Sequence, residues 1–396
     1  MSNKESQTIQ WHEWGKEAFE KAAKEKKPLL LSISGSWCHW CHVMDETTYS
    51  DARVIAGIAE NFVPVRVDTD RRPDINARYN LGGWPTTAFL TPEGELITGG
   101  TYLPPGKMAD VLKSVARYYK EQPEEVAKEH EREGAGERKK TAIPLKETYQ
   151  VKEGTYETET FADLIGFIAD QFKTNFDREY GGFGKAPKFP MVEALELSQI
   201  AYVYEGDQKW EKIFTHTLRS MYSGGIFDPV EGGFFRYSTT RDWSIPHYEK
   251  MLEDNARLLS VLLISYKLTA DEIFAQAARE TLGYLENNLY LPNMKGWAGS
   301  QDADEAYYAL PLEKRQQREK PAIDRTIYVN WNAYLVRSLF SAAVILAEPQ
   351  WYSHALETLQ MLLDRCYQPE KGMAHYLEEG VEEAQLWGML EDQAAM

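Results

Sequence analysis

The sequence predicts two domains of different class, an α/β domain followed by an all-α domain built from helical hairpins. Up to about residue 121, short apolar runs alternate with helical segments, whereas from Thr158 onward long amphipathic helices follow one another. Between these two patterns the chain is highly charged, with twelve charged side chains among residues 121–140. We therefore expect a first domain over residues 8–121, a charged linker over residues 122–157 and a helical domain over residues 158–396.

The pattern of apolar residues predicts each element of the first domain. A helix over residues 15–27 places Ala18, Phe19 and Ala22 on one face and ends before a proline. Two longer helices are expected over residues 38–61 and 107–120. Four short strands are predicted, over residues 29–34, 62–68, 86–90 and 96–98.

The first strand is followed directly by two cysteines, in the run Ser36-Trp37-Cys38-His39-Trp40-Cys41-His42. At the N-terminus of a helix, unsatisfied N–H groups and the helix dipole stabilise a thiolate on Cys38. Two intervening residues allow the two sulfur atoms to approach disulfide distance. Protonated His39 and His42 would add positive charge and favour the reduced form, which makes the pair more oxidising.

A proline precedes the third predicted strand, in the run Gly82-Gly83-Trp84-Pro85-Thr86. We predict a cis peptide bond at Pro85 and place this proline beside Cys38, as in a thioredoxin-type site. Strand, CxxC pair, helix and X-Pro-strand together are far more specific than a CxxC pair alone. We therefore predict Cys38 as the exposed nucleophile and Cys41 as the resolving thiol, supported by Trp37, His39, Trp40, His42 and Pro85.

The same cysteines have three alternative interpretations. The spacing Cys38-x-x-Cys41-His42 matches the c-type haem attachment signature, but that use needs export, and residues 1–27 show no apolar signal segment. A structural zinc ion would need four ligands, which one helical turn cannot supply, so we assign no metal and no cofactor. The pair could also be structural, without turnover. Cys366 lies in an apolar helix and is expected to be a buried, inert thiol.

Composition restricts the partners and the compartment. Forty-four Lys and Arg against 61 Asp and Glu leave a net charge of −17, which argues against a nucleic acid or an anionic membrane as the main partner. No apolar run approaches the roughly 20 residues that span a bilayer. Residues 1–27 contain no apolar core followed by a cleavage site, so we expect an unexported protein in the reducing cytoplasm, and three cysteines are too few for a disulfide framework. The aromatic content of 12% fits either aromatic-lined ligand clefts, such as sugar sites, or a helical core packed with rings.

The second domain contains a faint internal repeat. A segment at residues 177–183 recurs at residues 228–234, and both have the form Asp-x-x-x-Gly-Gly-Phe after a helix. Recurring helix–glycine loop–helix units indicate an (α/α) array, either an open solenoid or a closed toroid. Roughly seven or eight helices fit the sequence, whereas a six-hairpin toroid needs about twelve. We therefore expect an incomplete toroid-like domain, which a shortened variant or a fragment of a longer protein would explain.

Polar residues in the glycine-rich loops and helix starts form a second candidate site: Asp228, Arg236, His247, Glu249, Glu253, Asp254, Asp302 and Asp304. Toroid enzymes gather such residues at one mouth, where paired carboxylates, or His with Glu, cleave glycosides or epimerise sugars. With Trp243, Trp297 and Trp331 nearby, the group predicts a ligand pocket. Singly, each residue could equally be a helix cap, a loop hydrogen bond or a surface charge. Asp177 and Lys188 are expected to be structural.

Several longer segments resemble the spermatogenesis-associated protein 20 family. They are residues 36–44, 67–74, 82–85, 89–92 and 99–102 in the first domain, and 182–190, 232–237, 246–255 and 301–304 in the second. The resemblance covers about residues 8–390. It implies a thioredoxin-like domain followed by an (α/α) toroid similar to the six-hairpin glycosidases and N-acylglucosamine 2-epimerases. It also implies that this chain is shorter than typical members.

Two functions follow from these observations. The first is a thiol–disulfide oxidoreductase that acts on protein thiols or disulfides and uses its helical domain to bind a ligand or partner. The alternative is a carbohydrate-active toroid, epimerase- or glycosidase-like, that acts on a sugar-like small molecule and carries an accessory thioredoxin-like module. Compared with thioredoxins, Ser32 replaces a buried acid and His39-Trp40 replaces Gly-Pro, which favours a more oxidising or a binding role. An interaction scaffold without turnover is the third possibility.

Overall fold

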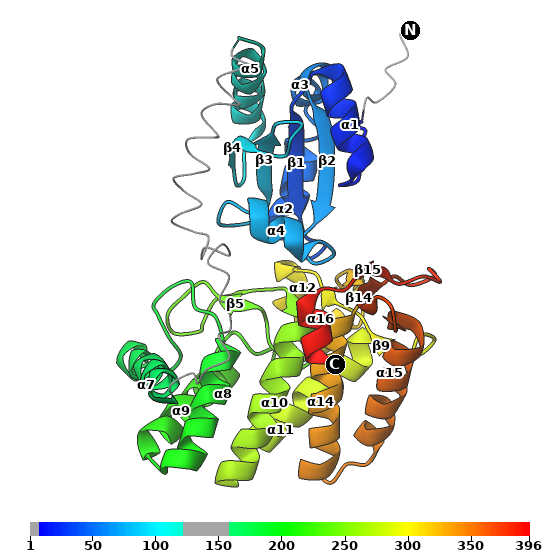
Figure 1. Ribbon diagram of the computed structural model, residues 1–396. Helices are drawn as coiled ribbons and strands as arrows, with labels where there is room; N and C mark the ends of the chain where they lie inside the picture. The colour runs from blue at the N-terminus through cyan, green and yellow to red at the C-terminus, as the bar shows by residue number, and fades with distance from the viewer. Residues whose placement is uncertain (1–7, 122–157) are drawn as a thin grey trace. The chain divides into compact units, whose positions relative to one another are not determined.

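The computed structural model describes residues 8–121 and 158–396, so the predicted charged linker lies outside the described residues (Figure 1). Contacts divide the chain into two units, Met1–Thr155 and Tyr156–Met396. Within the described ranges, none of the helices has the length and apolar character needed to cross a bilayer.

The first unit is built on a four-stranded mixed sheet in the order β2-β1-β3-β4. Its strands are β1 (Leu29–Ser34), β2 (Val63–Asp68), β3 (Thr86–Leu90) and β4 (Leu96–Gly100), so all four predicted strands are confirmed. β1 runs parallel to β2 and antiparallel to β3. β3 and β4 are antiparallel neighbours. This is a thioredoxin-like topology.

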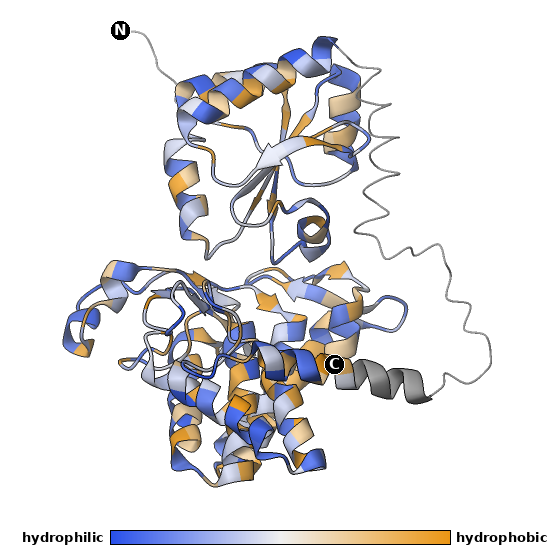
Figure 2. Cartoon of the chain, turned by 90° about the vertical axis from the view of Figure 1, so that its left-hand side faces the viewer, coloured by the Kyte–Doolittle hydropathy of each residue, from blue (hydrophilic) through white to orange (hydrophobic). Residues whose placement is uncertain are grey.

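Helices cover both faces of this sheet. Successive residues of β1 point to opposite faces, so Leu30 packs with α3 (Ala52–Asn61) and α5 (Pro105–Glu121), whereas Leu31 packs with α1 (Lys16–Glu25) and α4 (Pro73–Tyr79). A strand covered on both faces reads as a continuous apolar run, as β1 does. The helices are banded blue and orange in Figure 2, as expected when one helix face is buried.

The single helix predicted over residues 38–61 is wrong, because the chain forms two helices, α2 (His39–Thr47) and α3. The Asp51 side chain accepts a hydrogen bond from the Arg53 backbone N–H at 2.8 Å and so caps α3. The Thr48 hydroxyl donates to the Leu103 carbonyl at 2.8 Å, which holds the break against the rest of the domain. The helix α4, which begins at a proline, was not predicted from the sequence.

The second unit is a mainly helical, toroid-like array of helical hairpins. Its described residues include seven helices of thirteen or more residues: α7 (Thr158–Asn175), α8 (Val192–Glu205), α9 (Gln208–Ser223), α10 (Leu252–Thr269), α11 (Glu272–Tyr284), α14 (Val329–Ile345) and α15 (Gln350–Cys366). The expectation that strands disappear here is wrong. Short strands, β5 to β15, gather with the loops at one end of the long helices (Figure 1). Residues 386–396 are only partly helical, as β15 (Gln385–Trp387) and α16 (Leu390–Ala395).

The internal repeat proves to be a repeated loop structure. In one copy the Asp177 N–H donates to the Gly182 carbonyl at 2.8 Å, and in the other the Asp228 N–H donates to the Gly233 carbonyl at 3.0 Å. The glycines have φ between +68° and +81°, a region that favours glycine. Each aspartate binds a buried lysine, Lys188 in the first copy and Lys250 in the second. Asp177 and Lys188 are thus structural, as expected.

One face of α15, late in the chain, is apolar and exposed. Tyr352, Leu356 and Leu363 lie on this face and are 43–53% exposed. Replacing Leu356 and Leu363 by glutamate is expected to reduce self-association of the protein, because association removes such an exposed apolar face from water. Light scattering against concentration measures the effect. Gln360→Glu, a nearby exposed change, is the control, and unchanged self-association in the double variant would contradict the prediction.

Candidate functional site

The two cysteines of the first domain form a disulfide at the start of α2. Cys38 is the N-cap residue of this helix, and the two Cα atoms are 5.2 Å apart in the disulfide. The Cys41 backbone N–H donates a hydrogen bond to Cys38 Sγ at 3.2 Å. A thiolate on Cys38 would receive the same hydrogen bond and the positive end of the helix dipole, both of which stabilise negative charge on sulfur.

The disulfide is less accessible than the sequence analysis expected. Cys38 and Cys41 are each only 4% exposed, so Cys38 is not the more exposed sulfur in this oxidised state. The physical reason is local, since the Cys38 side chain turns back to cap the helix. Trp40 instead is 49% exposed, and its ring centroid lies 5.3 Å from that of Tyr102. The accessible surface beside the disulfide is therefore aromatic.

Two tryptophans flank the redox segment, and the loop after β2 holds both. The Trp37 indole N–H donates to Asp70 Oδ2 at 2.5 Å, and the Trp84 indole N–H donates to Thr69 Oγ1 at 3.1 Å. The Asp68 side chain in turn accepts the Asp70 backbone N–H at 2.9 Å. Asp68, Thr69 and Asp70 had no predicted role, although polar side chains directly after a buried strand were the available signal.

The remaining residues predicted to support the redox site are Pro85, His39 and His42. The Trp84–Pro85 peptide bond is cis, which confirms that prediction. His42 Nε2 lies 3.0 Å from the Ser36 carbonyl oxygen, and His39 is exposed beside Trp40. Ser32 is buried in β1, and burial raises the pKa of the neighbouring Tyr49 hydroxyl.

In the helical domain, Asp228 belongs to a buried ion-pair network. Its carboxylate accepts from Lys250 Nζ at 2.7 Å and from Arg315 at 2.6 and 3.1 Å, and all three side chains are buried. Burial lowers the pKa of Lys250 to about 8, although the Asp228 charge opposes this. Burial acts to raise the pKa of Asp228, but the Lys250 charge and the hydrogen bonds from Arg315 and Lys250 together outweigh burial and lower that pKa. Asp228 is thus structural here, and the sequence analysis missed Lys250 and Arg315 as its partners.

His247 and Glu249 form a close pair. His247 Nδ1 lies 2.5 Å from Glu249 Oε2, and the His247 ring stacks on Tyr237 with centroids 4.9 Å apart. Glu249 is fully buried, and its Oε1 atom has no hydrogen-bond partner among the described residues. Such an oxygen is costly unless a ligand or water supplies a donor. The His247 side chain is 25% exposed, so this pair reaches the surface.

Arg236 contacts the backbone of this pair, and Glu253 and Asp254 follow it closely in the sequence. The Arg236 N–H donates to the Glu249 carbonyl at 2.8 Å, and both acids stand in the first turn of α10. Burial, with the Glu253 charge, raises the pKa of Asp254 to about 7, and Arg236 opposes the shift. Burial also raises the pKa of Glu253. Carboxyl groups that hold a proton near neutral pH are candidate general acids.

The remaining predicted pocket residues have structural environments. The Asp304 side chain caps α12 (Glu305–Tyr308) by accepting the Tyr307 N–H at 2.8 Å, which is the capping alternative. Asp302 accepts the N–H of the next residue at 2.7 Å. Trp243 and Trp297 are fully buried and Trp331 nearly so, as core residues are. Cys366 is buried, and burial raises its thiol pKa to about 12, as expected of an inert thiol. Within the described ranges, no group of three His, Cys, Asp or Glu side chains could hold a metal ion.

The raised pKa of Asp254 makes the stability of the helical domain depend on pH. The ordinary pKa of this carboxyl group is 3.8, so between about pH 4 and pH 7 the folded protein binds more protons than the unfolded one. The free energy of unfolding therefore falls as the pH rises through this range. Asp254→Asn is expected to remove this loss. The melting temperature of the variant, relative to that of the parent, should therefore rise between pH 5 and pH 8. Parallel pH dependences in both proteins would show that Asp254 is already ionised at pH 5.

Comparison with known proteins agrees with this two-part architecture. The family described as "Thioredox_DsbH: Protein of unknown function, DUF255" matches residues 1–135. Spermatogenesis-associated protein 20 of Rattus norvegicus is 34% identical over 314 residues, which are 75% of this chain and 39% of the rat protein. This chain is a member of the spermatogenesis-associated protein 20-like family.

This spermatogenesis-associated protein 20-like chain is shorter than the rat, human and mouse proteins. The alignments span 39–43% of the length of these three proteins. Disulfide bond reductase DsbH of Chlamydia pneumoniae is 27% identical over 117 residues, which are 26% of this chain and 70% of that protein. Among solved structures, cellobiose 2-epimerase from Spirochaeta thermophila DSM 6192 is similar with a TM-score of 0.44 and 19% identity, over 57% of this chain and 59% of that one.

Proposed function

We propose that the first domain is a thiol–disulfide oxidoreductase, with Cys38 as the attacking sulfur and Cys41 as the resolving sulfur. The observation that carries the proposal is the Cys38–Cys41 disulfide at the N-terminus of α2, where the Cys41 N–H points at Cys38 Sγ. The similarity to a protein named disulfide bond reductase DsbH supports the same chemistry. Cysteine usage supports a cytoplasmic location, since only three cysteines are present.

The reaction that we propose has two exchange steps. In the reducing direction, the Cys38 thiolate attacks a substrate disulfide, forms a mixed disulfide and releases one substrate thiolate. The Cys41 thiolate then attacks Cys38 Sγ, which releases the second substrate thiolate and closes the Cys38–Cys41 disulfide. Two electrons pass from the cysteine pair to the substrate. The reverse sequence oxidises a substrate dithiol.

The aromatic surface beside the disulfide supports protein cysteines as the substrate. Trp40 and Tyr102 lie together, and Leu81 is exposed in the segment before Pro85. When a polypeptide covers apolar surface of this kind, the surface is removed from water and the free energy falls. A small hydrophilic thiol such as glutathione could not cover it to the same extent.

The experiment that tests this function is the equilibrium of the Cys38–Cys41 pair against glutathione buffers, measured beside insulin reduction in dithiothreitol. We expect a single two-electron transition and insulin reduction above the rate with dithiothreitol alone. Cys366→Ser is the control, because that buried thiol should not contribute. A disulfide that stays closed in every buffer and a rate equal to the blank would reject the function.

A second function is favoured by the unpaired oxygen of buried Glu249. We propose that His247 and Glu249 transfer protons to and from a polyhydroxylated, sugar-like ligand, with Asp254 as a general acid. Stacked Phe189, Tyr237 and His247 rings offer an apolar platform for a sugar face. Saturation-transfer NMR with cellobiose and mannose tests binding. Signals that His247→Ala abolishes would support this function, and their absence from the parent chain would reject it for these sugars.

A further inference from the structure

The helical domain contains a basic hollow that neither function above uses. Its volume is about 520 Å³, which is within the range typical of small-molecule sites. The lining consists of four cationic side chains, a histidine and two apolar residues: Lys173, Arg178, Lys209, Lys212, His216, Phe176 and Ile213. This lining includes no carboxylate, although the whole chain has a net charge of −17.

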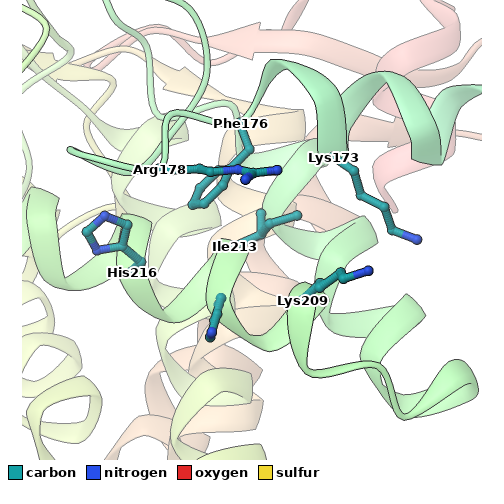
Figure 3. Close-up of a pocket in the computed structure, with 7 residues that line it drawn as sticks. Lys173, Phe176, Arg178, Lys209, Ile213 and His216 are labelled. Carbon is teal, nitrogen blue, oxygen red and sulfur yellow. The ribbon is translucent and has the colours of Figure 1, made fainter.

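The arrangement follows from helical spacing. Lys209, Lys212, Ile213 and His216 stand at intervals of three and four residues on α9, so they share one face of that helix. Lys173 comes from the last turn of α7, and Phe176 and Arg178 follow it in the next loop. In Figure 3, Lys173 and Lys209 extend to one side of Ile213 and His216 lies on the other side.

The loop that carries Arg178 is held in place by the first copy of the internal repeat. The Asp177 side chain accepts the backbone N–H groups of Glu179 and Tyr180 at 3.1 and 3.2 Å. The Gly182 N–H donates to Thr217 Oγ1 of α9 at 2.7 Å. The loop and α9, which are two walls of the hollow, are therefore tied together before any ligand arrives, which lowers the entropic cost of binding.

The positive charges in the hollow are poorly compensated. Within residues 8–121 and 166–396, no carboxylate forms an ion pair with Arg178, Lys209 or Lys212. Lys173 lies 3.8 Å from Glu205 and over the Trp210 ring, so it is partly paired. Asp177, the acid beside Arg178 in sequence, already binds Lys188 and Arg241. Like charges gathered without counter-charges repel one another, and an anion would relieve that repulsion.

The other lining residues complement a larger molecule than an ion. Phe176 and Ile213 are apolar, and the Phe176 and His216 ring centroids are 6.1 Å apart, edge to face. His216 Nε2 is buried, and no described residue forms a hydrogen bond with it. A ligand that carries an anionic group and an apolar ring with a polar atom would satisfy all three features.

We propose that this hollow binds a phosphorylated small molecule. The phosphate oxygens lie among Arg178, Lys209 and Lys173, the apolar part of the ligand lies on Phe176 and Ile213, and a polar atom of that part bonds His216 Nε2. A phosphate group suits the site better than a carboxylate because it carries up to two charges and three acceptor oxygens for several cations. The guanidinium of Arg178 can bind two of these oxygens at once.

Isothermal titration calorimetry on the full chain at low ionic strength tests the proposal, with ADP and pyrophosphate as probes. We expect both probes to bind, ADP more tightly, and acetate and adenosine not to bind. Arg178→Glu and Lys209→Glu are each expected to weaken binding by at least about tenfold, because each removes a charge-assisted hydrogen bond. Lys267→Glu makes the same charge change at an exposed position of α10 outside the hollow and should leave binding unchanged.

Three results would count against the proposal. If neither ADP nor pyrophosphate binds the parent chain, the hollow is not a phosphate site. If Lys267→Glu weakens binding as much as Arg178→Glu, the attraction is a general effect of charge and the site is rejected. Equal affinities for ADP and pyrophosphate would overturn the contacts with Phe176 and Ile213. Circular dichroism of each variant confirms that a loss of binding is not a loss of fold.

Discussion

Cys41→Ser is expected to accumulate mixed disulfides with protein substrates, and Cys38→Ser is expected to accumulate none. In Cys41→Ser the attacking sulfur remains at the N-terminus of α2, but no thiolate is left to release the bound substrate. In Cys38→Ser the remaining Cys41 sulfur lies inside the first turn and does not receive the hydrogen bond that the Cys41 N–H gives to Cys38 Sγ. Both variants should reduce insulin at the uncatalysed rate. Non-reducing electrophoresis followed by mass spectrometry identifies the trapped species.

The matched control for this experiment is Cys366→Ser, which keeps the redox pair and removes the third thiol. It should reduce insulin at the parent rate and trap nothing. Alkylation of the reduced protein against pH gives an independent measurement, in which Cys38 should react before Cys41. If Cys38→Ser traps as much substrate as Cys41→Ser, the assignment of the two sulfur atoms is reversed. If neither traps substrate, the pair is structural.

Asp228→Asn is expected to destabilise the helical domain by about 3–5 kcal/mol, because it leaves the Lys250 ammonium and the Arg315 guanidinium buried without their shared carboxylate. The substitution keeps the shape of the side chain, so the loss measures the missing charge and not a cavity. Lys250 also lies over the Phe235, Tyr284 and Tyr308 rings, but these attract a cation less strongly than a carboxylate does. Urea unfolding followed by tryptophan fluorescence measures the change.

Arg318→Ala is the matched control for the buried network. Arg318 pairs with Asp304 at 3.3 Å, but both side chains are substantially exposed, so this pair should contribute less than about 1 kcal/mol. A similar loss of unfolding free energy in both variants would show that the buried Asp228 network contributes no more to stability than an exposed ion pair. Asp228→Asn with parent-like stability would show that Glu231 alone suffices for Arg315, and that Lys250 either is satisfied by the Gly232 carbonyl or loses its proton.

Much of the first domain could be predicted from the sequence because its signals are local. The apolar run of β1 and the residues after it already predict a strand, a CxxC pair and a helix start, and Pro85 before β3 predicted the cis bond that is present. The break between α2 and α3 was missed because it depends on Thr48 reaching Leu103, 55 residues away. A contact over that distance leaves no periodic signal in the sequence.

In the candidate sites too, features that depend on local sequence were predictable and features that depend on distant contacts were not. The sequence by itself determined the CxxC pair at a helix start and the helical repeats, since each depends on residues within a few positions, and it named His247 and Glu249 as candidates without pairing them. Tertiary structure decided that Asp228 meets Arg315, 87 residues later, and that Trp243 and Trp297 fill the core. It also brought Lys173 and Arg178 to the basic face of α9. The physical reason is that burial and charge compensation depend on all atoms within a few ångströms, and most of those atoms come from distant parts of the chain.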